Sequence, residues 1–203
     1  MTARELTTTS YAILSLLGVR SWTTYELKQQ MDRSLRSMWP RAASVLYEEP
    51  KRLVERGLAR SRVEYTGRRR STVYEITPQG REALRAWLDE PGGAGPVLEF
   101  EALVKVAFAD HGGLAQLRAT LREIRADAEG RLAVTADRMT EYEATRGPYP
   151  DRLPVIALTA RLLREQNELL LRWAQWAEAE VATWTGVTPE TGARVPPDAF
   201  SNG

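Results

Sequence analysis

The chain has 203 residues, of which 43% are hydrophobic and 27% charged, and it contains no cysteine. This balance is typical of a globular protein, and the lack of cysteine excludes disulfides and thiolate chemistry. No apolar run approaches the roughly 18 residues of a membrane span, and the first ten residues lack an apolar signal region. We therefore expect a cytoplasmic protein without a signal peptide.

The formal net charge of +1 conceals an uneven distribution along the chain. Residues 1–90 carry 16 Lys and Arg against 11 Asp and Glu, whereas residues 91–203 carry 12 against 16. Within residues 36–70, ten basic residues stand beside only four acidic ones. This imbalance indicates an anionic partner for the N-terminal half, with ordinary scatter of surface charge as the alternative.

Two short helices are predicted at the start of the chain. Residues 10–18 carry apolar side chains at helical spacing and end in a glycine, which is typical of a buried helix. Thr23 and Glu26 have the spacing of a capping box, so a second helix should begin there and run to about Ser34. Its N-terminus could hold a phosphate, although we expect Thr23 to act mainly as a cap.

A third helix is predicted from Pro40 to a stop at Gly57. Pro50 interrupts it, because proline cannot donate to the Leu46 carbonyl and its ring crowds that turn. We expect either a kink near residues 46–50 or two short helices in sequence. The exposed residues before Pro50, which we expect to face DNA bases, are Arg41, Ser44, Tyr47 and Glu48.

A basic hairpin should follow this helix. Residues 58–66 and 73–77 alternate as strands do, and Gly67 with Arg68–Arg70 occupies the predicted turn. A helix fits the DNA major groove, while arginines on a turn suit phosphates or a narrow minor groove. Thr77 and Pro78 mark the start of another helix, and the Gly/Pro cluster at 91–96 is the clearest domain boundary.

The C-terminal half is predicted to be helical. A short helix over 97–110 and a long one over 114–142 precede the break at 147–150, and a last helix covers 153–184. The last helix has two apolar faces, so we expect subunit association, with packing inside one subunit as the alternative. The predicted dimer interface consists of Ile156, Leu163, Asn167 and Leu170, with Asn167 setting the register.

No pattern in the sequence indicates catalysis. The single histidine, His111, lies in an Asp-His-Gly-Gly turn, where we expect it to cap a helix end. No cysteine and histidine cluster has metal-ligand spacing, and no glycine-rich phosphate loop occurs. We therefore expect a protein that is not an enzyme and that takes no cofactor or metal.

Several segments of the N-terminal half together match one known pattern, namely Tyr11-Ala-Ile-Leu-Ser-Leu-Leu, Thr24-Tyr-Glu-Leu27, Val45-Leu-Tyr47, Lys51-Arg-Leu-Val-Glu-Arg-Gly-Leu58, Gly67-Arg-Arg-Arg70 and Val73-Tyr-Glu-Ile-Thr-Pro-Gln-Gly-Arg81. Through them, residues 10–90 resemble the PadR family of bacterial transcription regulators, and residues 98–184 are similar in layout to its helical C-terminal domain. One departure stands out: the family often has proline directly after Tyr47 and leucine two residues later, where this chain has Glu48 and Pro50.

The resemblance implies a mainly α-helical protein with an N-terminal winged helix-turn-helix and a C-terminal helical dimerisation domain. The expected domains are a DNA-binding domain (1–91), a dimerisation domain (97–184) and a flexible tail (185–203). It further implies a homodimeric repressor that binds double-stranded operator DNA of inverted symmetry. The predicted DNA-binding residues are Thr24, Tyr25, Arg41, Ser44, Tyr47, Lys51, Arg68, Arg69 and Arg70.

Members of this family often respond to small aromatic or drug-like effectors. The chain has six tryptophans, and Trp87, Trp173 and Trp176 are the candidate effector contacts, with core packing as the alternative. The rival hypothesis from another class is a helical interaction module whose basic half binds an acidic protein or a membrane surface. A membrane role would favour a basic amphipathic helix, whereas here the arginines cluster near a turn.

Overall fold

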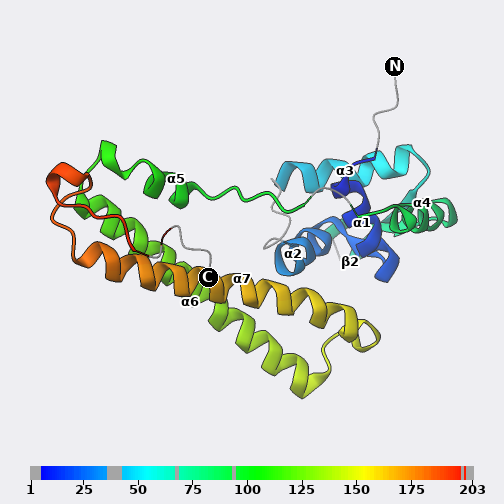
Figure 1. Ribbon diagram of the computed structural model, residues 1–203. Coiled ribbons are helices and arrows are strands. Elements are labelled where there is room, and N and C mark those ends of the chain that lie inside the picture. The colour runs from blue at the N-terminus through cyan, green and yellow to red at the C-terminus, as the bar shows by residue number, and fades with distance from the viewer. Residues whose placement is uncertain (1–5, 36–42, 67–68, 93–94, 198, 200–203) are drawn as a thin grey trace. The chain divides into compact units, whose positions relative to one another are not determined.

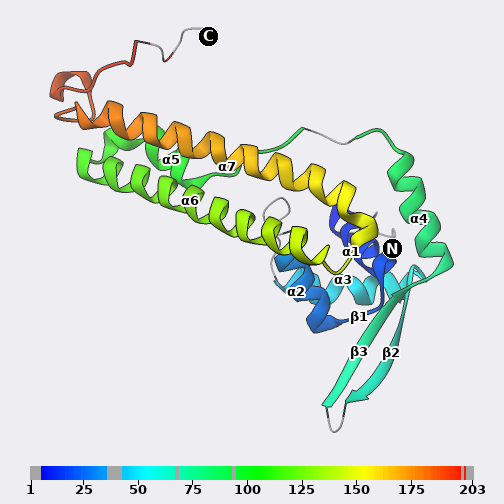
Figure 2. The same cartoon turned by 90° about the horizontal axis from the view of Figure 1, so that it is seen from below.

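The computed structural model describes residues 6–35, 43–66, 69–92, 95–197 and 199. The chain divides into two compact units, Met1–Gly95 and Pro96–Gly203, which Figures 1 and 2 show from two sides. Among the described residues, no helix is both long and apolar enough to span a membrane. The predicted class is confirmed: the chain is mainly helical, with one small antiparallel sheet in the N-terminal unit.

The N-terminal unit begins with α1 (Thr8–Val19), whose apolar side chains form much of the core. A short strand, β1 (Trp22–Thr23), leads into α2 (Thr24–Ser34). The predicted capping box is present, because the Thr23 hydroxyl accepts from the Glu26 N–H and the Glu26 carboxylate accepts from the Thr23 N–H. The expected role of Thr23 as a cap is therefore what the structure shows.

Helix α3 (Ala43–Glu55) runs through Pro50 as one element. The alternative of two short helices is thus wrong, while the predicted start at Pro40 lies outside the described residues. Helix α3 tolerates the missing N–H because the Pro50 ring is fully buried in the core, where it gains apolar contact. The helix ends at Glu55, just before the predicted stop at Gly57, whose φ of 73° suits a residue without a side chain.

Strands β2 (Ala59–Thr66) and β3 (Arg69–Ile76) form the hairpin, and the sheet order is β1-β3-β2. The second strand was predicted to start at Val73, but it starts four residues earlier. Its early residues lack apolar alternation, yet backbone pairing continues to the end of the hairpin, where Tyr65 lies opposite Arg70. Arg69 and Arg70 therefore belong to a strand and not to the turn, which corrects the prediction.

Helix α4 (Pro78–Asp89) starts as predicted, with Thr77 as its N-cap and proline at its first position. The Thr77 hydroxyl accepts from the Gly80 N–H at 3.0 Å and donates to the Gly57 carbonyl at 2.6 Å. Gly80 allows close approach, since a Cβ atom there would lie 2.0 Å from the Leu58 carbonyl oxygen. These contacts fix the base of the hairpin to α3 and α4.

The C-terminal unit contains α5 (Glu101–Ala107), α6 (Leu114–Thr145) and α7 (Leu153–Ala182). Helices α6 and α7 lie side by side and antiparallel, as the green and orange ribbons in Figure 2 show. The predicted break between them is present, with Arg146 and Gly147 both left-handed. Three short 3-10 turns complete the unit: η1 (Ala109–His111), η2 (Pro150–Arg152) and η3 (Pro189–Thr191).

The core of the C-terminal unit joins α6 to α7. Leu117, Leu121 and Ile124 of α6 are buried against one face of α7, made of Ala174, Ala177 and Val181. Trp184 and Val187 pack against the same cluster. Val187 lies within residues 185–203, which were predicted as a flexible tail, so part of that segment contributes to this core.

Candidate nucleic-acid interface

Helix α3 has one face in the core and one in solvent. Leu46, Glu49, Pro50 and Leu53 are buried at the spacing of one helical stripe. The opposite stripe carries Tyr47, which is 41% exposed, together with Glu48 and Lys51. Of the residues before Pro50 that were predicted to face DNA bases, Tyr47 and Glu48 have described side chains, and both lie on the solvent side of α3.

Helix α2 brings further polar groups close to this stripe. Tyr25 is 56% exposed and its hydroxyl accepts a hydrogen bond of 2.9 Å from Gln29 Nε2. Lys28 pairs with Asp32 at 2.9 Å. Asp32 is the main cause that raises the pKa of Lys28, and Tyr47 and Tyr25 raise it by smaller amounts. Both phenols thus lie within electrostatic reach of one ammonium group, which places Tyr25 and Tyr47 on a shared surface of α2 and α3.

The N-terminal end of α2 is capped by a carboxylate of its own first turn. A hydrogen bond from the Thr23 backbone is the main cause that lowers the pKa of Glu26, and Arg20 contributes at 3.1 Å. The ionised Glu26 already lies beside the positive end of the helix. Thr24 is the first residue of α2 and is half-buried.

The hairpin carries two kinds of arginine. Arg60 contacts the Glu75 carboxylate at 3.0 Å and 3.2 Å, and Arg62 contacts Glu64 at 2.8 Å and Glu75 at 3.3 Å. Nearer the turn, Arg70 is exposed, and no carboxylate among the described residues pairs with it. Among the hairpin arginines whose side chains the structure describes, the one nearest the turn is therefore the one without a carboxylate partner.

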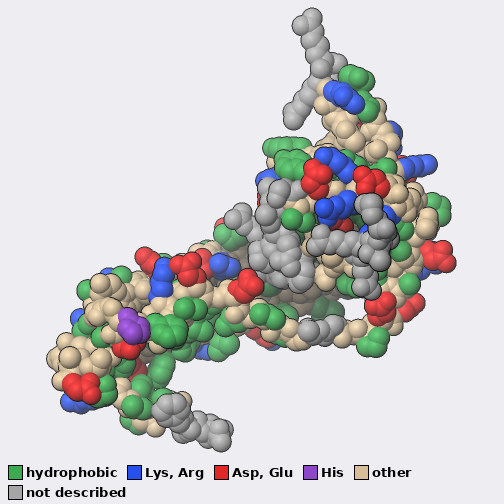
Figure 3. Space-filling view, turned by 90° about the horizontal axis from the view of Figure 1, so that it is seen from above, with side chains coloured by type: hydrophobic (Ala, Val, Ile, Leu, Met, Phe, Trp, Pro, Cys, Tyr) green, Lys and Arg blue, Asp and Glu red, His purple; other side chains and the backbone are tan. Residues whose placement is uncertain are grey.

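Some predicted contacts cannot be placed. Arg41 and Arg68 lie outside the described residues, and for Ser44 and Arg69 only the backbone positions, in α3 and β3, are described. The structure adds Tyr65 of β2, which is 70% exposed opposite Arg70 and which the prediction missed. Strand alternation groups Tyr65 with Ala59 and Val63, which suggests an inward face, so the sequence pattern did not indicate this exposure. Figure 3 shows that basic and acidic side chains lie next to one another on this face of the N-terminal unit.

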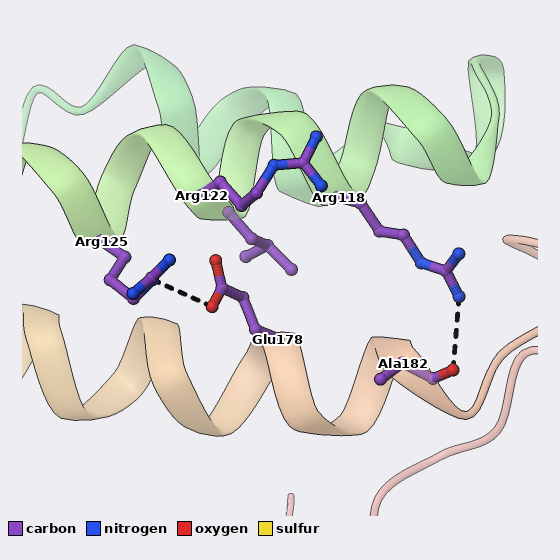
Figure 4. Close-up of a pocket in the computed structure, with 6 residues that line it drawn as sticks. Arg118, Arg122, Arg125, Glu178 and Ala182 are labelled. Carbon is purple, nitrogen blue, oxygen red and sulfur yellow. Dashed lines mark hydrogen bonds and ion pairs between the residues drawn. The ribbon is translucent and has the colours of Figure 1, made fainter.

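A separate hollow of about 370 Å³ lies between α6 and α7, and Figure 4 shows its charged lining. Arg118 donates to three carbonyls at the end of α7, those of Val181, Ala182 and Trp184, at 3.1–3.3 Å. Arg125 lies 3.1 Å from Glu178 and 3.4 Å from Glu129. The remaining lining residues are Leu121, Arg122 and Ala182, so the hollow has three guanidinium groups and one carboxylate.

The candidate effector tryptophans do not line this hollow. Trp87 of α4 stacks on Tyr11 of α1 with ring centroids 4.7 Å apart, and Trp173 packs against the core of the C-terminal unit. Trp176 is 37% exposed on α7. Packing thus accounts for Trp87 and Trp173, which was the alternative explanation for both.

Helix α7 has two apolar faces, and the C-terminal part of one of them packs on α6. The stripe that contains Ala174 and Ala177 packs on α6, and Ile156, Leu163 and Leu170 continue it at helical spacing. Asn167 donates to the Leu163 carbonyl of the same helix at 2.6 Å. The other apolar face is the exposed one, and its members are Val155, Leu158, Leu162, Leu169 and Trp176.

No described group of three or more histidine, cysteine, aspartate or glutamate side chains could hold a metal ion. His111 lies in η1 and stacks on Phe108 with ring centroids 6.3 Å apart.

Comparisons with known proteins agree with this geometry. Residues 13–86 match the sequence model of the transcriptional regulator PadR-like family, and residues 100–182 match that of the virulence activator alpha C-terminal family. A search of curated proteins found no match.

Solved structures share the fold. Bacillus subtilis PadR in complex with operator DNA has a TM-score of 0.72 at 18% identity, covering 86% of this chain and 99% of that one. The same protein in complex with p-coumaric acid gives 0.63 at 18% identity, with coverage of 85% and 98%. The Vibrio cholerae virulence activator AphA gives 0.65 at 24% identity, with coverage of 86% and 98%. At these identities the likeness shows the fold alone.

Proposed function

The chain belongs to the PadR-like family of transcriptional regulators, and we propose that it is a homodimeric repressor that binds a specific operator and is released by a small molecule. The observation that carries this proposal is the shared surface of α2 and α3. Its exposed side chains are Tyr25, Tyr47, Glu48 and Lys51. On the neighbouring hairpin, Arg70 is exposed and pairs with no carboxylate among the described residues.

In the proposed complex, α3 enters the major groove. Arg41, Ser44 and Tyr47 would contact bases or nearby phosphates, because we expect the part of α3 before Pro50 to reach deepest into the groove. Thr24 and Tyr25 of α2 would lie along the backbone. Lys51 would reach phosphate or a base edge, and Arg68, Arg69 and Arg70 would follow phosphates or the minor groove.

The proposed dimer forms through the exposed face of α7. Val155, Leu158, Leu162, Glu165, Leu169, Arg172 and Trp176 alternate by three and four residues, as in a coiled-coil seam. Glu165 and Arg172 interrupt this apolar seam with opposite charges. In an antiparallel pair with two-fold symmetry, Glu165 of each copy would meet Arg172 of the other, and Leu169 would lie at the axis.

Two copies related in this way would present two α3 helices to one DNA duplex. We therefore propose an operator with inverted symmetry, whose half-sites lie about one helical turn apart or a multiple of it. This role would place the protein in the compartment that holds the DNA.

The proposed effector is a small aromatic carboxylate, and the proposed site is the hollow between α6 and α7. Three arginines against one glutamate favour an anion there, and a relative with this fold forms a complex with p-coumaric acid. Calorimetry should show binding of p-coumarate but not of its neutral methyl ester, and Arg122→Gln should weaken it at unchanged melting temperature. Equal binding of acid and ester, or no binding by any aromatic carboxylate, would remove this site.

The function is tested by fluorescence anisotropy with DNA from upstream of the protein's own gene and a scrambled control. Selective binding at 0.15 M salt supports a regulator. Equally weak binding to both, together with binding to phosphatidylserine vesicles or an acidic protein, would support the rival interaction module instead. Transcription in vitro from the same promoter shows whether the protein represses or activates. A decrease in transcript supports repression, and an increase would make the protein an activator, as AphA is named.

A further inference from the structure

Glu48 and Lys51 form an ion pair at the centre of the exposed stripe of α3. Lys51 Nζ lies 2.8 Å from Glu48 Oε1, and the two side chains are 56% and 58% exposed. They are one turn apart, and the core-facing stripe of Leu46, Pro50 and Leu53 lies on the opposite side of the helix. Whatever α3 approaches with its exposed stripe therefore meets this pair.

A carboxylate at this place is unexpected for a helix that approaches DNA. Duplex DNA carries about one negative charge per 1.7 Å of its axis, so an unpaired carboxylate would oppose binding. The hydrogen bond from Lys51 is the largest cause that lowers the pKa of Glu48. An ionised Glu48 can accept hydrogen bonds but cannot donate them. The pair is locally neutral, and this removes the repulsion without removing the acceptor.

The major groove offers few partners to such an acceptor. Only the amino groups, N4 of cytosine and N6 of adenine, donate there, while guanine N7 and O6 and thymine O4 accept. A G·C pair presents two adjacent acceptors on guanine beside one donor on cytosine. An ammonium group held next to a carboxylate has the complementary arrangement.

We propose that the Glu48–Lys51 pair reads one G·C base pair in each half-site, with Glu48 accepting from cytosine N4 and Lys51 donating to guanine O6 or N7. An A·T pair fits less well for two reasons. The adenine N7 acceptor lies next to the N6 donor and would repel the carboxylate, and the lysine would find one acceptor, thymine O4, where guanine offers two. This inference rests on the proposed function, and it makes Glu48 a residue that determines specificity.

The test compares wild type, Glu48→Ala and Glu48→Gln by selection from a random DNA pool, followed by anisotropy on the selected site. Wild type should prefer G·C at one symmetric position by about tenfold or more, in line with the discrimination of one good base contact. Glu48→Ala should lose the preference there and keep it elsewhere. Glu48→Gln should shift it toward adenine, since glutamine pairs with adenine N6 and N7.

Glu55→Ala is the matched control, because Glu55 is exposed on the same stripe two turns further along. It removes the same charge and should leave the selected sequence unchanged. If Glu48→Ala instead tightens binding to all sequences equally, the carboxylate only repels DNA and the inference fails. A wild-type protein that selects no sequence would refute the proposed function itself, so the two failures are distinguishable.

Discussion

The Ser10 hydroxyl on α1 donates a hydrogen bond of 2.5 Å to Glu49 Oε1 on α3, inside the core of the N-terminal unit. Glu49 is only 8% exposed and lies between Leu46 and Pro50 on the buried stripe. A buried carboxyl group needs its partner, so α3 cannot rotate about its axis without breaking this bond. The bond therefore helps to hold Tyr47 and Lys51 in the outward direction.

Ser10→Ala should lower the free energy of unfolding by about 1–3 kcal/mol, because Glu49 Oε1 loses its donor. The Thr7 hydroxyl accepts from the Ser10 N–H at 3.3 Å, so Thr7→Ala removes this cap of α1 and keeps the donor to Glu49. Ser10→Ala combined with Glu49→Leu should recover part of the loss, since an apolar pair leaves no unpaired group. Urea denaturation measures all of these, and an unchanged midpoint in Ser10→Ala would contradict the prediction.

Replacing Arg68, Arg69 and Arg70 with alanine should flatten the salt dependence of DNA binding. Each lost phosphate contact removes about 0.9 from the slope of log K against log salt, so a decrease of about 1–3 is expected. Arg60→Ala is the control, because Glu75 already neutralises that arginine. An unchanged slope in the triple variant would exclude the hairpin from the DNA contact.

Reversing one charge on the outer face of α7 should dissociate the dimer. Arg172→Glu would place a carboxylate against Glu165 of the other copy twice, raising the dimer dissociation constant by at least about tenfold. Adding Glu165→Arg restores opposite charges and should restore the dimer. Arg131→Glu on α6, where Arg131 pairs with Asp127, is the control. Sedimentation equilibrium decides: a dimer unaffected by Arg172→Glu contradicts the proposed seam.

The cap of α2 should make stability depend on pH. The pKa of Glu26 is lowered in the fold, so its contribution is complete above the unfolded pKa and is lost as pH falls through the folded pKa. Because the side chain is 39% exposed, we expect no more than about 1 kcal/mol. Glu26→Gln should be less stable than wild type at pH 7 and equally stable near pH 3, whereas Glu82→Gln on exposed α4 should not show this pattern.

Local signals in the sequence were sufficient for much of the fold. The Thr23 and Glu26 spacing located the start of α2, and the Thr77-Pro78 pair located α4, because caps depend on neighbouring residues only. For α3, the sequence around Pro50 left open a kinked helix or two short ones, because burial of the proline ring is a tertiary effect. Likewise, the start of β3 depends on backbone pairing with β2, which the basic residues at 69–70 do not indicate.

The candidate site was harder to predict than the fold. The exposed stripe of α3 followed from helical spacing, but the burial of Glu49 depends on Ser10, which lies 39 positions earlier. On α7, spacing defined two apolar faces but could not tell which one packs on α6. That choice depends on small residues, Ala174 and Ala177, which let the two helices approach closely.

The most direct test of the central claim is selection of bound duplexes from a random DNA pool by the full-length protein. A dimer that reads DNA with α3 should enrich an inverted repeat whose half-sites lie about one helical turn apart, or a multiple of it, and should bind that repeat far more tightly than a scrambled sequence. A pool that stays random after repeated rounds, with equal weak affinity for all members, would contradict the claim.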